Sequence, residues 1–351
     1  MNNKLSTRRS VLRGAAWIGT AALLTHGAAA LAQAASPAPS SEAWQKLVEA
    51  AKKEGMVTLY TGQGLDQAND LAARFKKEYG ITVQVVRAVG SELQAKVDAE
   101  QAAGRGIADI YVGTDVPILR DRNAKKHLVA PVGPAFENPV YNRKLRVPEG
   151  TYFEISAAIL TFSWNKDLYP KGLKDYPDLL DPALKGKIGV AMISVMAQAD
   201  FYVYLEEKYG ADFTKKLADM NPRLYPGALP MAQAVVSGEI VAAVSTQPLI
   251  DEIKKGAPVG WGLAPGGAWG SHFYGQILSV APHPNAAQLL ANYMITPPGQ
   301  EAIARLAASA LPNVPGAITS TDNTRRTDWN KLNPEFFNAY LAKWKPMYVK
   351  Q

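Results

Sequence analysis

The segment Met56-Val57-Thr58-Leu59-Tyr60-Thr61-Gly62-Gln63-Gly64 decides the fold, because it joins a run of β-forming residues to a tight loop. β-Branched and aromatic residues favour a strand over 56–60, and the glycines favour a sharp turn after it. The following run, Asp66–Tyr79, places Leu71 and Phe75 on one helical face. The order strand, loop, helix predicts one unit of a parallel sheet that is covered by helices.

The same alternation of strand and helix continues along the chain and indicates an α/β protein. We recognise strands by short runs of β-branched residues, and helices by apolar residues at helical spacing with a glycine or proline at the end. The further segments expected on these grounds are strands over 81–86, 107–112, 188–193 and 240–244, and helices over 42–54, 92–103, 196–208, 214–219, 232–237, 249–255, 285–294, 299–308 and 334–344.

Two β-rich runs are placed where they can carry the chain between two lobes. Tyr152–Trp164 is long enough to leave a first lobe, and Phe273–Val280 can return to it. We therefore expect a two-lobed α/β protein with a ligand cleft between lobes that are joined by crossover strands. Residues 42–152 would form the first part of lobe 1, residues 153–272 lobe 2, and residues 273–351 the return to lobe 1 with the C-terminal helices.

The N-terminus has the pattern of an export signal. Thr7-Arg8-Arg9-Ser10-Val11-Leu12-Arg13 is followed by the uncharged stretch Gly14–Leu31 and by Ala32-Gln33-Ala34. The paired arginines resemble a twin-arginine signal, although Val11 stands where that pattern usually has Phe. We expect residues 1–34 to be removed and the mature protein to work in the periplasm. The alternative is an N-terminal membrane anchor, but glycine, threonine and histidine interrupt the apolar stretch.

Composition narrows the function classes. The chain carries a formal charge of +7, and four of its basic residues lie in the predicted signal, so the mature chain is +7 − 4 = +3. So small a charge without a basic block argues against a nucleic-acid partner. The chain has no cysteine, which excludes disulfides, thiolate metal sites and iron–sulfur clusters. We expect a monomer without a cofactor.

The order of several loose motifs resembles the two-lobed solute-binding proteins of ABC importers, in the group that includes ferric-ion, polyamine, thiamine and phosphonate binders. Each motif is loose alone, and their order and spacing are more specific. The stretches that carry the resemblance are Glu49-Ala50-Ala51-Lys52-Lys53-Glu54-Gly55, Gly106-Ile107-Ala108-Asp109-Ile110, Asp181-Pro182-Ala183-Leu184-Lys185-Gly186-Lys187-Ile188-Gly189, Met231–Glu239, and Pro284–Leu290 with Gly299-Gln300-Glu301.

The resemblance implies a type II periplasmic-binding-protein fold, in which a solute is held between the lobes at the carboxyl ends of the strands. The lobes would close on a hinge, and the closed form would dock on a permease in the inner membrane. Three alternatives stay open: a ferric-ion binder with a non-standard site, a sensor for a membrane kinase, and a secreted hydrolase. The chain has no G-x-S-x-G or H-E-x-x-H motif, which disfavours the hydrolase.

The candidate ligand contacts are loop residues that follow predicted strands, and aromatic or basic residues near the two crossings. Backbone amides in a glycine loop bind anions, hydroxyl and amide groups bond polar ligands, and aromatic rings sandwich organic ones. The alternatives are ordinary turns and caps, core rings and surface charges; for Asp115 a helix cap is the better interpretation, and Arg87 is a second basic candidate. The predicted ligand-binding residues are Tyr60, Thr61, Gly62, Gln63, Thr114, Tyr152, Ser194, Arg223, Thr246, Gln247, Trp269, His272 and Tyr274.

One place in the sequence distinguishes a ferric-ion site from a site for an organic ligand. The ferric-ion binders that the chain resembles carry adjacent tyrosines near the place where this chain has Ser245-Thr246-Gln247-Pro248, and phenolates suit Fe³⁺. The chain has no adjacent tyrosine pair, and Tyr202 and Tyr204 would face different directions on a helix. We therefore expect a small, polar, anionic organic solute and no metal.

Overall fold

The structure is a computed structural model that describes residues 42–88 and 90–349. The predicted export signal therefore lies outside the described residues. In the part of the chain that the structure describes, no helix combines the length and apolar character that crossing a bilayer requires.

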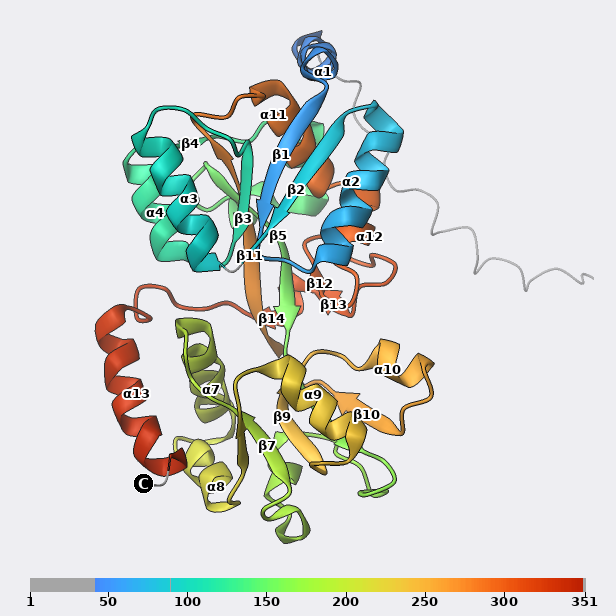
Figure 1. Ribbon diagram of the computed structural model, residues 1–351, viewed down its shortest axis with the longest axis vertical. Coiled ribbons are helices and arrows are strands. Elements are labelled where there is room, and N and C mark those ends of the chain that lie inside the picture. Colours follow the sequence, from blue (N-terminus) through green and yellow to red (C-terminus); the bar gives the residue numbers. More distant parts are fainter. Residues whose placement is uncertain (1–41, 89, 350–351) are drawn as a thin grey trace, which may run out of the picture. The chain divides into compact units, whose positions relative to one another are not determined.

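A nine-stranded sheet forms the first lobe (Figure 1). Its central strands run in the order β5-β11-β3-β1-β2; β3, β1 and β2 are parallel, whereas β11 is antiparallel to both of its neighbours. The strands are β1 Met56–Thr61, β2 Thr82–Arg87, β3 Ile110–Gly113, β4 Leu128–Val129, β5 Tyr152–Ile159, β11 Ala268–Leu278, β12 Ala308–Ser309, β13 Thr319–Ser320 and β14 Thr324–Arg325.

Helices cover both faces of this sheet, as the alternation of strand and helix predicts. Leu59 lies in one core with Phe75 of the helix after β1, whereas the next residue, Tyr60, lies in the other core with Leu93 and Val97. The first face packs on α1 Glu42–Glu54, α2 Leu65–Tyr79, α5 Pro134–Glu137, α11 Pro284–Met294 and α12 Pro297–Ile303, and the second on α3 Gly90–Ala102 and α4 Val116–Ala124; the short helices η1 Pro139–Tyr141 and α6 Arg143–Arg146 precede β5.

A five-stranded sheet forms the second lobe, with the order β10-β6-β9-β7-β8. Residues 60 and 190 thus lie in different sheets, as two lobes require. The elements are β6 Thr161–Asn165, β7 Ile188–Ala191, β8 Arg223–Tyr225, β9 Ala242–Thr246, β10 Val259–Gly262, η2 Tyr176–Leu180, η3 Pro182–Leu184, α7 Met196–Tyr209, α8 Phe213–Asp219, α9 Ala228–Ser237 and α10 Ile250–Lys254.

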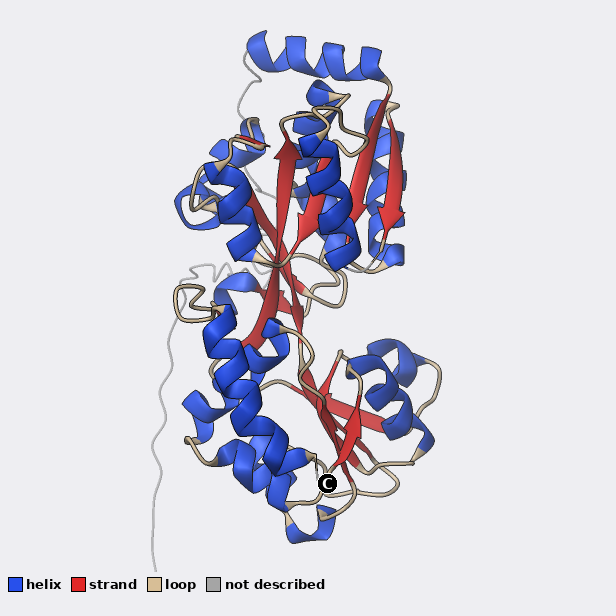
Figure 2. Ribbon diagram, turned by 60° about the vertical axis from the view of Figure 1, so that its left-hand side comes forward, coloured by secondary structure: helices blue, strands red, loops and turns tan. Residues whose placement is uncertain are grey.

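The chain passes from the first sheet to the second at Leu160. The predicted strand over 152–164 is in fact two strands: β5 belongs to the nine-stranded sheet and β6 to the five-stranded one. Figure 2 shows strands running through the junction between the two sheets. The return strand β11 begins at Ala268, five residues before the predicted start, so Trp269 and His272 lie on the strand and not before it.

Several other predicted ends differ from the observed ones, among them β7 Ile188–Ala191, β9 Ala242–Thr246 and α9 Ala228–Ser237, and two of the differences have a clear local reason. The strand predicted from Ile107 begins at Ile110, because the amides of Ile107 and Ala108 donate to Glu100 Oε2 (2.8 and 3.0 Å) and form a turn. The helix predicted to reach Ala308 ends at Ile303, because Ala308–Ser309 pairs with β5 as a short strand.

The C-terminal segment returns to the second lobe. After η4 Thr321–Asn323 and β14, helix α13 Pro334–Tyr348 lies beside α7 and α8 (Figure 1). Trp344 stacks on Tyr348 with ring centroids 4.4 Å apart, and the Tyr348 hydroxyl donates to the Thr214 carbonyl (2.6 Å). The chain therefore passes between the sheets a third time.

Candidate functional site

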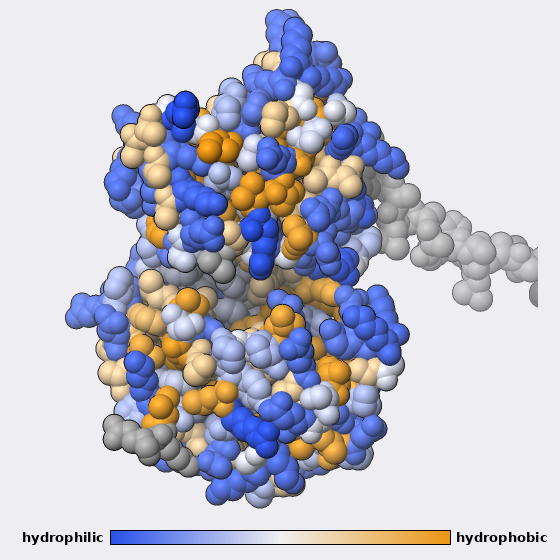
Figure 3. Space-filling view, in the orientation of Figure 1, coloured by the Kyte–Doolittle hydropathy of each residue, from blue (hydrophilic) through white to orange (hydrophobic). Residues whose placement is uncertain are grey.

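The carboxyl ends of the strands border the hollow between the two sheets, which the space-filling view shows (Figure 3). The loop after β1 is tied to its neighbours. Thr61 Oγ1 accepts from the Gln63 amide (3.1 Å), Gln63 Nε2 donates to Ser156 Oγ (3.0 Å), and the Gly62 amide donates to the Val112 carbonyl (3.3 Å). The polar groups of Thr61, Gly62 and Gln63 are thus largely engaged within the first lobe. Thr61 and Gln63 are buried, and Gly62 is half-buried.

Three predicted tyrosines are core residues. The Tyr60 hydroxyl donates to Glu100 Oε1 (2.9 Å), and burial together with this carboxylate raises the pKa of Tyr60 to about 12. Tyr152 and Tyr274 meet edge to face at 5.6 Å. Burial also raises the pKa of both phenols. These rings therefore fill the core under α3, although Tyr274 also reaches a cavity that is described below.

In the second lobe the predicted residues have different surroundings. Thr246 is fully buried and shares a hydrogen bond with Thr161 (3.1 Å), whereas Gln247 directly after it is exposed. Arg223 pairs with Glu239 at the amino end of β8, so it does not join the residues at the carboxyl ends. In the first lobe, Thr114 is half-buried after β3, and Asp115 is the N-cap residue of α4 without a side-chain cap bond.

Ser194 stands before the first turn of α7, where three donors meet one oxygen. The Ser194 amide, the Ser194 hydroxyl and the Val195 amide lie 2.6, 3.0 and 3.3 Å from Gln198 Oε1. The Gln198 side chain thus folds back over the start of its own helix. These donors form an oxygen-binding cradle, and an internal amide oxygen fills it.

A cavity of about 170 Å³ brings three predicted residues together. They are Trp269, His272 and Tyr274 of β11, and Ala197 of the first turn of α7 lies on the same cavity. Sequence reasoning missed the wall that comes from the C-terminal segment, because no local pattern marks it. The full lining is Leu145, Pro148, Ala197, Trp269, Ser271, His272, Tyr274, Arg326, Thr327 and Trp329.

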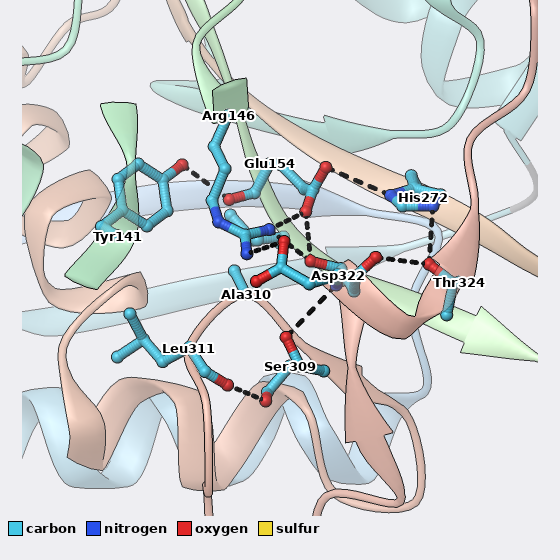
Figure 4. A network of polar contacts seen from close by, with 12 residues as sticks. Tyr141, Arg146, Glu154, His272, Ser309, Ala310, Leu311, Asp322 and Thr324 are labelled. Atoms are coloured by element: carbon cyan, nitrogen blue, oxygen red, sulfur yellow. Dashed lines mark hydrogen bonds and ion pairs between the residues drawn. The ribbon is translucent and has the colours of Figure 1, made fainter. Parts of the chain in front are cut away.

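A buried charge network lies behind this cavity (Figure 4). The fully buried carboxylate of Glu154 contacts the guanidinium groups of Arg146 and Arg326 and lies 3.2 Å from His272 Nδ1. Burial alone would raise the pKa of Glu154, but hydrogen bonds and charge from His272 and Arg326 hold it well below its usual range. On the other side of the ring, His272 Nε2 lies 3.1 Å from Thr324 Oγ1.

A second carboxylate holds the cavity wall to α7. Asp200 accepts from Trp269 Nε1 (2.9 Å), Arg325 Nη1 (2.7 Å) and Thr327 Oγ1 (2.7 Å). The neighbouring arginines thus bind carboxylates on different lobes, Arg325 on α7 and Arg326 on β5. Because the indole N–H of Trp269 donates to Asp200, Trp269 can contact a molecule in the cavity through its ring but not through a hydrogen bond from Nε1.

Comparison with known proteins identifies the family. A family model described as bacterial extracellular solute-binding protein matches residues 70–336. This chain is a bacterial extracellular solute-binding protein. The two-lobed α/β fold expected from the sequence is confirmed.

The names of proteins similar to this solute-binding protein refer to different ligands. The iron uptake protein A1 of Synechocystis sp. (strain ATCC 27184 / PCC 6803 / Kazusa) is 27% identical over 133 residues, which are 38% of this chain and 36% of that protein. The match thus spans little more than a third of the curated relative.

Solved structures match over nearly the whole described chain at low identity. Iron-bound HitA from Pseudomonas aeruginosa has a TM-score of 0.64 and 18% identity, covering 83% of this chain and 99% of that one. AfuA from Actinobacillus pleuropneumoniae, with fructose-6-phosphate bound, has a TM-score of 0.63 and 20% identity, covering 85% and 100%. Such identities establish the shared fold.

In the described part of this solute-binding protein, neither a cluster of acids and histidines nor the pair Tyr202 and Tyr204 is arranged to hold a metal ion. Within residues 42–88 and 90–349, no group of three or more His, Cys, Asp or Glu side chains is placed to hold an ion. Tyr202 and Tyr204 are buried and donate to different carbonyls, those of Ala191 (2.6 Å) and Gly267 (2.7 Å). Burial raises the pKa of both phenols, which opposes the phenolate form that ferric iron needs.

Proposed function

We propose that this protein is a periplasmic receptor that captures a small anionic organic solute by hinge closure and delivers it to the permease of an ABC importer. The observation that carries the proposal is the set of three donors at the start of α7. They converge on Gln198 Oε1 at 2.6, 3.0 and 3.3 Å.

An oxyanion suits these donors better than the amide oxygen does. A carboxylate or phosphonate oxygen would accept the same three bonds, and charge-assisted hydrogen bonds are roughly twice as strong as neutral ones. The amino end of a helix also favours negative charge, and α7 has 14 residues. We infer that the anionic group of the solute displaces the Gln198 amide, while Thr114 after β3 and Gln247 after β9 offer further contacts from the two lobes.

Ferric iron is the second candidate, because relatives are named for iron. Against it stands Ser245-Thr246-Gln247 at the end of β9, near the place where the resemblance to ferric-ion binders implies paired tyrosines. A phenolate-to-iron charge-transfer band on adding ferric citrate, lost in a tyrosine variant, would favour the iron function over the organic solute.

Ser194→Ala tests the proposed contact. The probe is the compound that most raises the melting temperature in a screen of carboxylates, phosphonates and sugar phosphates, because a ligand stabilises the state that binds it. A hydrogen bond to a charged group contributes about 1.5–3 kcal/mol, so Ser194→Ala should weaken binding of this probe roughly ten- to a hundredfold in calorimetry.

The control is Ser237→Ala, at the far end of α9, where the hydroxyl bonds only its own helix end. It should bind as the wild type does. Scattering should show compaction on addition of the probe. Equal affinity of Ser194→Ala and wild type, or binding without compaction, contradicts the proposed site or the closure respectively.

A further inference from the structure

Large apolar side chains are exposed at the carboxyl edge of the second sheet. Met192, Val195 and Leu229 are 38%, 53% and 69% exposed. They lie on one edge, because β7 and β8 are parallel neighbours and the Met192 amide donates to the Tyr225 carbonyl (2.8 Å). A clustered apolar surface of this kind marks a binding site more often than isolated exposed residues do.

This edge carries no formal charge. Residues 192–198, 226–237 and 245–249, which form the three loops and following helix starts of the edge, contain no Asp, Glu, Lys or Arg. Their polar groups are hydroxyls, amides and backbone N–H groups. Figure 3 shows apolar residues along parts of the hollow that this edge borders. A solute that lies on this edge therefore meets apolar side chains beside neutral donors.

The edge of the first sheet supplies a cation. Arg87 ends β2 beside Thr61 and is exposed; among the described residues it donates only from Nε, to the Gln63 carbonyl (3.4 Å). Leu65, at the first position of α2, is 51% exposed. This edge also carries three acids. Burial raises the pKa of Asp115, and its Oδ1 is shielded from solvent, whereas Asp66 and Glu92 are exposed in the first turns of α2 and α3, and Glu92 pairs with Lys96.

We propose that the solute is an organic carboxylate with an apolar body, a narrower class than the anionic solute of the proposed function on which this inference rests. Its carboxylate pairs with donors and with Arg87, and its body covers Met192, Val195 and Leu229. A sugar phosphate would bring hydroxyl groups against these side chains, where they find no partners, and an unpartnered buried hydroxyl is costly. A hydrated or chelated metal ion meets the same obstacle.

The test is calorimetry with acetate, butyrate and hexanoate as probes. Each methylene buried on the apolar edge should tighten binding about fourfold. Adipate, which has the length of hexanoate but a second carboxylate at the far end, should lose this gain. An affinity that does not rise from acetate to hexanoate, or adipate binding as tightly as hexanoate, overturns the inference.

Two variants test which residues cause the gain in affinity from acetate to hexanoate. Leu229→Gln should flatten the dependence on chain length while acetate binds unchanged, whereas Arg87→Gln should weaken all three monocarboxylates by the same factor. The matched control is Leu168→Gln, which changes a 50% exposed leucine of the second lobe that lies outside the edge, and it should leave the series as in the wild type. If Leu229→Gln and Leu168→Gln behave alike, the apolar edge does not hold the body of the solute.

Failure of this inference can be told from failure of the proposed function. Tight binding of fructose 6-phosphate or ferric citrate with compaction, and no response to monocarboxylates, keeps a receptor function and overturns the apolar solute. Absence of stabilisation and of compaction with every carboxylate, phosphonate, sugar phosphate and ferric probe contradicts the receptor function itself, and the inference with it.

Discussion

Glu154 gathers two guanidinium groups and one imidazole around a carboxylate that has no contact with solvent. Removing one partner of a buried ion pair leaves uncompensated charge and costs about 3–5 kcal/mol. Glu154→Gln should therefore lower the free energy of unfolding by about this amount in urea at pH 7. The control is Glu207→Gln, which breaks an exposed pair with Arg325 and should cost less than about 1 kcal/mol.

The same carboxylate makes part of the stability depend on pH. Its pKa in the folded chain lies below the usual 4.5, so its contribution is present above that value and is lost as pH falls through the folded pKa. The difference between wild type and Glu154→Gln should hence shrink when unfolding is measured below about pH 4.5. A difference that stays constant down to pH 3 would show that the carboxylate charge is not the cause.

At the scale of residues, the sequence predicted one wall of the cavity and missed the other. Trp269, His272 and Tyr274 were predictable because an aromatic and polar cluster stands near a strand that returns between lobes. Arg326 was not, because its partner Glu154 is 172 positions away and no local pattern reports such a pairing. Tyr60 and Gln63 were predicted to contact ligand, but their side chains donate to Glu100 and Ser156 instead. A polar residue at a strand end can thus bond within the protein, which the sequence does not reveal.

At the scale of elements, the parallel strands and long helices were predictable because their apolar spacing is regular. The division of 152–164 into two strands was not, because no glycine or proline marks Leu160. The early start of β11 was hidden by Gly270, which favours a turn in isolation. In the sheet it allows close approach, since a Cβ there would lie 3.2 Å from that of Ala157.

Helix α13 gives a prediction at this scale. Trp344 is buried between Tyr348 and Tyr202, at ring distances of 4.4 and 5.9 Å. Trp344→Ala should lower the free energy of unfolding by about 3–5 kcal/mol, because it removes a large buried ring. Lys345→Ala, one residue on and exposed, should change it by less than about 0.5 kcal/mol. Similar small losses in both variants would mean that α13 is not an integral part of the second lobe.

At the scale of the whole molecule, three passages link the lobes: the step at Leu160, strand β11 and the segment before α13. The sequence predicted the first two, because a β-rich run can be recognised locally. The third depends on Arg325, Thr327 and Asp200 meeting across 125 or more positions. Long-range placement of this kind follows from the packed fold and not from any window of sequence.

The third passage has a practical consequence for observing closure. It puts the last described helix on the second lobe, while α1 packs on the first, so the two ends of the described chain report on different lobes. Since the chain contains no cysteine, Lys46→Cys with Lys345→Cys would offer the only thiols for a fluorescent donor and acceptor. Energy transfer should change when solute binds, whereas a pair at Lys46 and Lys77 within the first lobe should stay constant. Unchanged transfer in both pairs at saturation would rule out hinge closure, and a responding pair would make this solute-binding protein a ready optical sensor for its solute.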